Sequence, residues 1–136
     1  MGRIFLIGIL MCLSCFAHAQ YNKGIKIEPV LKTDTTSIGQ KLMYPQTDGP
    51  EVSISRITIP PGASTGWHKH LFPVFAYVEK GSLTVEIRDR GTVVFGKGQS
   101  FSEVINVFHN GSNRGTEDVV LFAVYLGEKN KPLSEH

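Results

Sequence analysis

The sequence predicts an all-β protein, built as a sandwich or a barrel of short strands. From residue 51 to residue 126, apolar residues alternate with polar ones or form short apolar runs, which is the pattern of strands. Glycine- and proline-rich turns separate these runs at regular intervals. No stretch shows an amphipathic helical pattern longer than about two turns. Many short strands joined by such turns are typical of sandwiches and barrels.

Residues 1–19 are expected to be a cleaved secretory signal peptide. Arg3 supplies a positive charge, residues 4–13 are almost wholly apolar, and the Ala-His-Ala sequence at 17–19 allows cleavage before Gln20. The apolar stretch is shorter than the roughly 20 residues that span a bilayer. The expected location is the periplasm or the extracellular space, and an uncleaved N-terminal anchor is the alternative.

Removal of this segment leaves a nearly neutral chain without thiols. Both cysteines, Cys12 and Cys15, lie in the signal, as does Arg3, one of 14 Lys and Arg residues. The 12 Asp and Glu residues all follow it, so the formal net charge becomes +1. No block of like charge suggests a partner such as nucleic acid, or a membrane after signal cleavage.

Residues 20–50 are expected to form an N-terminal arm with an edge strand. The strand candidate covers residues 25–31, and Pro29 within it favours an edge position. Residues 33–37 and 44–50 are polar and turn-forming. Such an arm could lie across the barrel, or exchange with a neighbouring subunit to form a homodimer.

Residues 51–128 are expected to form the barrel, and residues 129–136 a C-terminal tail with a disordered His136. The apolar phase slips at Ser55 and Arg56, which predicts a bulge. The expected strands cover residues 52–59, 74–78, 82–88, 92–95, 100–104, 107–109 and 119–126.

Three histidines are candidate metal ligands. His68 and His70 are two positions apart, so on a strand both imidazoles share one face, roughly 7 Å apart at the backbone. Rings so placed can converge on one ion at about 2 Å from each nitrogen. His109 is the third candidate.

The segment from Gly62 to Gly81 resembles the first motif of the cupin superfamily. Gly62 is followed after five residues by His68, Lys69 and His70, and Gly81 closes the motif. The strand–turn–strand around Gly81 is also similar to that of cupins.

The second cupin motif is partly present. His109, three residues and Asn113 match its end, and Gly98 matches the turn before it. The resemblance covers about residues 51–127. It implies a double-stranded β-helix, the cupin jelly-roll barrel, with one divalent metal ion inside. The ligands that it implies are His68, His70 and His109.

The chain departs from both motifs. The first motif normally has a glutamate seven residues before its last glycine, and Val74 stands there. The second normally has proline and glycine five and three residues before its histidine, where this chain has Val104 and Asn106. The usual fourth ligand is therefore missing from its usual position.

Three alternatives follow for the fourth position. Three neutral imidazoles could hold the metal, with water completing the shell. Glu103 could replace the lost carboxylate, because it is the only acid in the apolar segment 100–107. A similar Glu-x-x-x-x-x-His-Asn-Gly segment in exported cupin-like proteins favours Glu103 as ligand or general base. Alternatively, the metal is lost and the barrel binds only small molecules.

The resemblance leaves the reaction open, because this fold serves many activities. One hypothesis is a metal-dependent enzyme of dioxygenase, isomerase or lyase type on a small polar substrate, with Fe, Mn, Zn or Ni as the metal. The alternative is a non-catalytic periplasmic small-molecule-binding module.

Overall fold

The structure is a computed structural model that describes residues 24–136. The predicted signal peptide, its cleavage before Gln20 and both cysteines lie outside the described residues. Within residues 24–136, no helix is long and apolar enough to cross a membrane.

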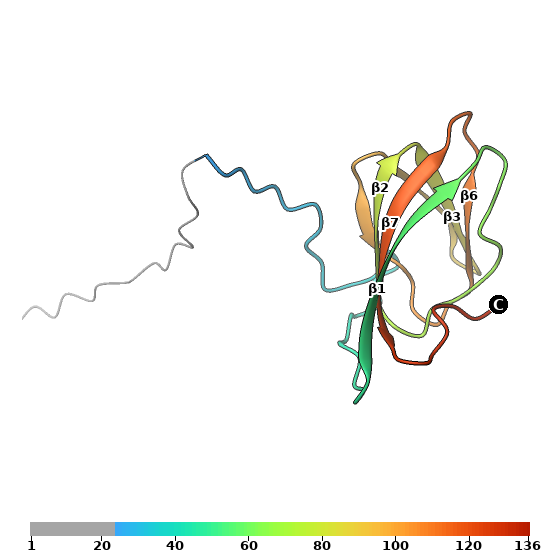
Figure 1. The fold of residues 1–136 in the computed structure, drawn as a ribbon. Coiled ribbons are helices and arrows are strands. Elements are labelled where there is room, and N and C mark those ends of the chain that lie inside the picture. Colours follow the sequence, from blue (N-terminus) through green and yellow to red (C-terminus); the bar gives the residue numbers. More distant parts are fainter. Residues whose placement is uncertain (1–23) are drawn as a thin grey trace, which may run out of the picture.

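Seven strands form two antiparallel sheets (Figure 1). The larger sheet has the order β1-β7-β2-β5, and the smaller has the order β4-β3-β6. All hydrogen-bonded neighbours run antiparallel. The strands are β1 (Pro50–Ile59), β2 (Val74–Lys80), β3 (Ser82–Ile87), β4 (Gly91–Gly96), β5 (Ser100–Ser102), β6 (His109–Asn113) and β7 (Val119–Glu128).

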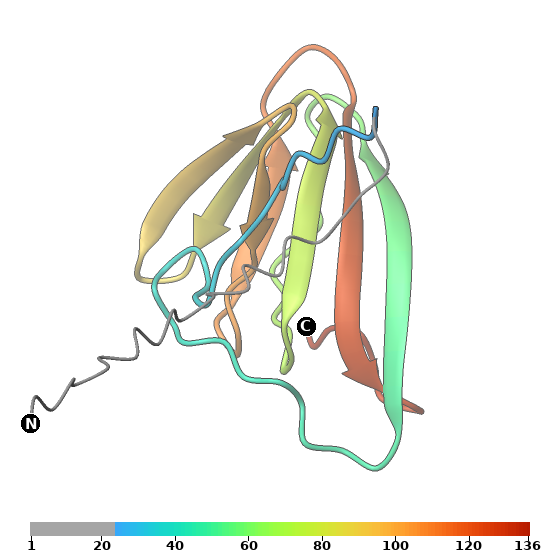
Figure 2. The same cartoon turned by 90° about the vertical axis from the view of Figure 1, so that its left-hand side faces the viewer.

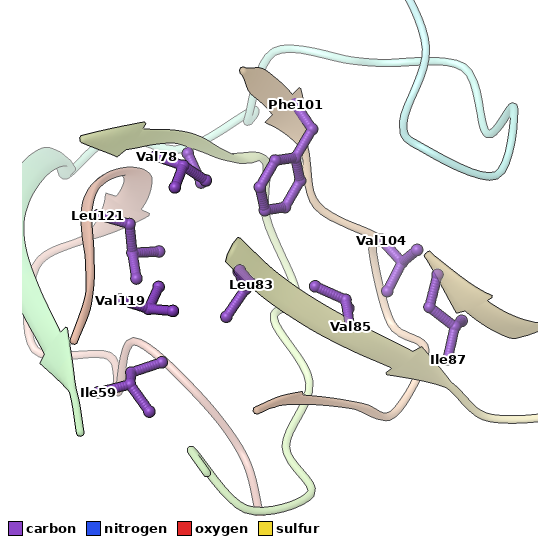
Figure 3. Packing of buried hydrophobic residues seen from close by; sticks show 10 residues of the cluster. Ile59, Val78, Leu83, Val85, Ile87, Phe101, Val104, Val119 and Leu121 are labelled. Carbon is purple, nitrogen blue, oxygen red and sulfur yellow. The ribbon is translucent and has the colours of Figure 1, made fainter. Parts of the chain in front are cut away.

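The hydrophobic core lies between the two sheets (Figure 3). Val78 on β2 and Val119 on β7 are fully buried, and Leu83 and Val85 face them from β3. Phe101 on β5 stacks on another phenylalanine of β4, with 3.7 Å between ring centroids. Apolar burial between two curved sheets drives this closure. The predicted all-β jelly-roll fold is confirmed.

Strand β1 is regular where the sequence predicts a bulge. Its register with β7 is unbroken from Pro50 opposite Glu128 to Ile59 opposite Val119. The slip in apolar phase is therefore a change of face: Ile57 and Ile59 point inward, whereas Val52 and Ile54 lie on the outer face, 61% and 68% exposed.

The N-terminal arm contains no strand over residues 25–31. Figure 1 shows this part, in blue, extending away from the barrel, and in Figure 2, viewed from that side, it passes in front of the sheet. The arm attaches further along the chain. Gln40 hydrogen-bonds both backbone groups of Ile105, donating to its carbonyl oxygen over 2.8 Å and accepting from its N–H over 2.9 Å.

The C-terminal tail folds back onto the barrel, and the expectation of a disordered His136 is wrong. Glu135 pairs with Lys69 through two backbone hydrogen bonds of 2.9 Å. The His136 ring lies 6.0 Å from that of His68, centroid to centroid. The tail therefore ends beside the candidate metal ligands.

Candidate metal centre

Four side chains meet inside one end of the barrel: His68, His70, Glu103 and His109. One potential ligand atom from each lies within 4.8 Å of all the others. His70 and His109 are each only 3% exposed. The structure thus brings together every residue that the sequence analysis singles out as a metal ligand.

Backbone pairing holds the three histidines in place. His68 exchanges two hydrogen bonds with His109, the first residue of β6, over 3.0 and 2.8 Å. The carbonyl oxygen of His70 accepts a 2.7 Å bond from the N–H of Asn106. The sequence predicts a strand at residues 107–109, whereas β6 begins at His109 and ends at Asn113.

Glu103 enters the site from the strand next to the expected one. It directly follows β5, and its N–H donates to the carbonyl oxygen of Val74 over 2.8 Å. Val74 itself is 1% exposed and packs against Ala123 and Tyr125 in a small apolar cluster. The carboxylate that the first cupin motif would place at residue 74 is therefore supplied from across the β2–β5 pair.

The loop between Glu103 and His109 keeps its shape despite the missing motif glycine. Asn106 has a φ of +54°, in the left-handed region. Asparagine is among the few residues other than glycine that adopt this region readily. Together with the Gln40–Ile105 bonds, this turn directs both Glu103 and His109 into the barrel.

Each imidazole uses its Nδ1 on a backbone carbonyl oxygen. His68 donates to Gly66 over 2.9 Å, and His109 donates to Val107 over 3.0 Å. His70 donates to Leu133 over 2.6 Å. A carbonyl oxygen only accepts, so the proton of a neutral ring is fixed on Nδ1 and Nε2 keeps its lone pair. This arrangement is typical of metal-binding histidines.

The Nε2 atoms converge on the carboxylate. One Glu103 oxygen lies 3.0 Å from Nε2 of His70 and 3.2 Å from Nε2 of His109. With both Nδ1 protons already used, neutral rings would place lone pairs against a carboxylate. Either added protons or a cation between these atoms removes that repulsion. The residues present therefore fit a divalent metal ion.

Without a metal ion, Glu103 and His109 shift each other's pKa in opposite directions. Burial alone would lower the pKa of His109, but the hydrogen bond and charge of Glu103 outweigh burial and raise it. Burial would raise the pKa of Glu103, but bonds from His109 and His70 lower it to about 2. Burial and the two neighbouring imidazoles lower the pKa of His68, against the bond to Gly66.

The four side chains open into a cavity of about 210 Å³. Its walls are mostly apolar, with Ile57, Leu83 and Leu121 among them. Its polar lining beyond the four candidate ligands is Thr65, Tyr125, Ser134 and His136. No lysine or arginine is among the described residues that line it.

Sequence reasoning missed two contributors to the site. Leu133 accepts a hydrogen bond from His70, and Gln40 braces the loop that carries Glu103. Both act across 63 or more residues of sequence, and Leu133 acts through its backbone oxygen. No residue pattern signals such a backbone contact.

Comparisons with known proteins agree with this architecture. A family model described as Cupin domain matches residues 55–125. A cupin-like protein from Thermotoga maritima superposes with a TM-score of 0.55 at 21% identity, over 62% of each chain. No curated protein sequence matches the chain.

Two enzymes share the fold over part of their length. An oxalate decarboxylase from Lactobacillus farciminis gives a TM-score of 0.52 at 22% identity, over 57% of this chain and 24% of that one. A DMSP lyase from Ruegeria pomeroyi gives 0.53 at 12% identity, over 63% and 42%. The match thus spans less than two thirds of each of these solved chains. Such likenesses show the fold alone, whereas the family model covers more than half of the sequence, and the chain therefore belongs to the cupin family.

Proposed function

We propose that this barrel binds one divalent metal ion through His68, His70, His109 and Glu103, and acts as a metal-dependent enzyme on a small polar substrate. The observation that carries the proposal is that one ring nitrogen from each of three histidines and one carboxylate oxygen lie within 4.8 Å of one another, while the Nδ1 of every ring is bonded to a carbonyl oxygen. Nitrogen and oxygen ligands in this ratio suit Fe(II), Mn(II), Zn(II) or Ni(II).

The charge of the site favours an anionic substrate. Three neutral imidazoles and one carboxylate would leave a bound divalent ion with a net charge of about +1. No lysine or arginine among the described lining residues would pair with the substrate, so its negative group would bind at the metal. The metal would supply Lewis-acid chemistry and lower the pKa of a bound water.

The residues around the ligands would set size and orientation. The walls are mostly apolar, and the volume of about 210 Å³ suits a substrate smaller than a drug-sized ligand. Thr65 and Tyr125 offer hydroxyl groups to a ligand there. Because the fold is shared with an oxalate decarboxylase and a DMSP lyase, oxalate and DMSP are the first compounds to test.

Metal analysis of the purified protein tests the proposal. We expect one metal ion per chain in the native protein, and loss of that metal in His68→Ala and in His109→Ala. His136→Ala, which changes a histidine outside the ligand set, is the matched control and should keep the metal. Stoichiometric metal in both ligand variants would contradict the proposed site.

A non-catalytic binding module is the second candidate, favoured by the mostly apolar cavity wall. Thermal-shift measurements with small carboxylates, on metal-loaded and metal-free protein, distinguish the two. Turnover that disappears with the metal supports the enzyme. Stabilisation by a ligand that is recovered unchanged, and that does not require metal, supports the binding module.

We further propose that the chain is exported, on the strength of the pattern in residues 1–19. The test is to express the full chain in a bacterial host, separate the cytoplasmic, periplasmic and secreted fractions, and sequence the N-terminus of the protein in each. We expect the mature chain to begin at Gln20. A periplasmic or secreted location would be contradicted by an intact Met1 in the cytoplasmic fraction.

A further inference from the structure

Residues 133–136, which we call the strap, form one wall of the candidate metal cavity. Leu133, Ser134 and His136 all line that cavity. Figure 1 shows the end of the chain, in dark red, returning to the barrel end after β7. The strap therefore borders the same cavity as the four candidate ligands.

The strap also contacts a candidate ligand directly. The Nδ1 of His70 donates to the carbonyl oxygen of Leu133 over 2.6 Å, and the two residues are 63 positions apart. By contrast, His68 and His109 each bond the carbonyl two residues before them. The orientation of His70 thus depends on a segment distant in sequence, whereas the other two rings are oriented by residues two positions before them.

Few interactions hold the strap in place. Glu135 exchanges two backbone hydrogen bonds of 2.9 Å with Lys69, and their side chains form an ion pair of 3.2 Å. Leu133 packs against the cluster of Val74, Ala123 and Tyr125.

The other side of the strap is open. Leu133, Ser134 and Glu135 also line a second cavity of about 540 Å³ outside the metal site. The strap therefore separates two cavities. Its position depends strongly on the Lys69–Glu135 pairing.

We infer that the strap is a positioning element of the metal centre: the Leu133 carbonyl fixes the ring of His70, and the Lys69–Glu135 pairing fixes that carbonyl. This inference rests on the proposed function. Loss of an outer-shell partner of a metal-binding histidine typically weakens metal affinity by about 10- to 100-fold. We expect the same range when the strap is released.

Three full-length variants separate the contributions. Glu135→Pro removes the ion pair and the N–H that donates to the carbonyl oxygen of Lys69, and leaves only the bond from the Lys69 N–H to the carbonyl oxygen of residue 135. Glu135→Ala removes only the ion pair. Glu117→Ala is the matched control, because it removes a comparable exposed ion pair with Lys80, far from the cavity. A fourth variant, ending at Pro132, removes the strap altogether.

The first measurement needs no metal. In EDTA-treated protein, the Nδ1–H protons of His70 and His109 should give downfield proton resonances, because each is hydrogen-bonded to a carbonyl oxygen. Both residues are buried, so these protons should exchange slowly with water. We expect the His70 resonance to disappear in Glu135→Pro and in the variant ending at Pro132. The His109 resonance should remain in both, as the internal control for an intact barrel.

The second measurement is titration with Co(II), followed by its visible absorption. We expect Glu135→Pro and the shortened chain to bind Co(II) about 10- to 100-fold more weakly than the native protein. Glu117→Ala should bind like the native protein, and Glu135→Ala should lie within a few-fold of it, since exposed ion pairs contribute little.

The two proposals fail in different ways. A native protein that binds no Co(II) overturns the metal site itself. Tight Co(II) binding by the native protein, Glu135→Pro and the shortened chain alike overturns the strap as a positioning element, and leaves the metal site standing. Persistence of the His70 resonance in the shortened chain would also overturn it, whatever the metal titration shows.

Discussion

Glu103 carries the only carboxylate of the candidate metal centre, and it lies opposite the position where the first cupin motif has its own. Its backbone N–H bonds the carbonyl oxygen of Val74, so the two positions are neighbours across a strand pair. Because Glu103 supplies the carboxylate, position 74 can hold an apolar side chain, and Val74 is only 1% exposed. The same carboxylate can thus be supplied from either of two adjacent strands and still lie beside the histidines.

Glu103→Gln keeps the side-chain volume and removes the charge. We expect metal affinity to fall by at least about tenfold, because a ligand contributes no less than an outer-shell partner. The pKa of His109 should fall as well, since Glu103 is what raises it. Metal titration and proton NMR of the imidazoles measure the two effects. Glu86→Gln, a carboxylate on β3 that pairs with Arg114, should change neither.

The pKa shifts of the metal-free site predict how its stability depends on pH. Glu103 is lowered from 4.5 to about 2, so its contribution is present above pH 4.5 and is lost as the pH falls toward about 2. His109 is raised above 6.5, so its contribution is present below pH 6.5 and is lost as the pH rises through the raised pKa.

We therefore expect the unfolding temperature of EDTA-treated protein to fall as the pH rises above 6.5 and through the raised pKa of His109. Metal takes the place of the His109 proton, so metal affinity should rise over the same pH range. Thermal unfolding with and without Mn(II) across this range measures both trends. In His109→Ala the metal-free protein should not show this fall of the unfolding temperature. If that variant shows the same fall, the pairing with Glu103 is not its cause.

At the scale of elements, the turn between β2 and β3 requires glycine for two reasons. Gly81 has a φ of +76°, and a Cβ built there would lie 2.8 Å from the carbonyl oxygen of Asp118. Gly98, in the turn before β5, has a φ of +84° but no atom within 4 Å of such a Cβ. A side chain at either position would strain the backbone, but only at Gly81 would it also clash with a neighbouring atom. Comparing the two substitutions therefore separates these two losses of stability.

We expect Gly98→Ala to destabilise the fold by about 1–2 kcal/mol, the cost of a left-handed residue with a Cβ. Gly81→Ala should cost about 2–5 kcal/mol, because the contact with Asp118 forces the backbone to shift as well. Urea unfolding of the metal-free proteins measures both. Equal losses in the two variants would mean that the β2–β3 turn relaxes around the added methyl group.

Alternation along the chain was enough to predict the strands that form the core. It gave the correct fold class and placed β2, β3, β4 and β7 to within a few residues. It failed where apolar residues are not buried: Val52 and Ile54 suggested a bulge, whereas they lie on the exposed outer face. The arm at residues 25–31 is apolar but finds no neighbouring strand.

The sequence predicted which residues meet at the candidate site, but not the contacts that orient their side chains. Spacing identified the histidines, and an isolated acid in an apolar segment identified Glu103. Whether Glu103 faces inward depends on the left-handed turn at Asn106 and on Gln40, which is bonded to the loop from 65 residues away. The contact of His70 with a backbone oxygen is likewise tertiary, and sequence pattern carries no information on it.

At the scale of the whole molecule, the outer face of β1, at one edge of the larger sheet, exposes the apolar side chains of Val52 and Ile54. Val52 and Ile54 lie opposite Leu126 and Val124 on β7, and the next outward-facing pair is Arg56 with Phe122, which is 36% exposed. The outer edge of β1 pairs with no strand among residues 24–136. Contiguous exposed apolar surface beside an open strand edge is typical of an association site.

We expect two copies of the chain to associate through this face. The two-fold arrangement common in homodimers would place β1 against β1, and each copy would cover the apolar residues of the other. The same chain also carries exposed apolar side chains on its arm, at Ile25, Ile27 and Val30, which could pack on the partner. Both unpartnered surfaces would then be buried by one contact.

Light scattering over a range of concentrations tests this expectation. The native protein should have twice the mass of the chain, and a Val52→Ser, Ile54→Ser double variant should have the mass of one chain. Val94→Ser is the matched control, because Val94 is 57% exposed on β4, in the other sheet. A single-chain mass for the native protein at every concentration would contradict the dimer. Because Val52 and Ile54 are exposed in the single chain, each substitution should change the stability of the single chain by no more than about 0.5 kcal/mol. Any further loss relative to the native protein should grow with protein concentration, since it comes from the lost association.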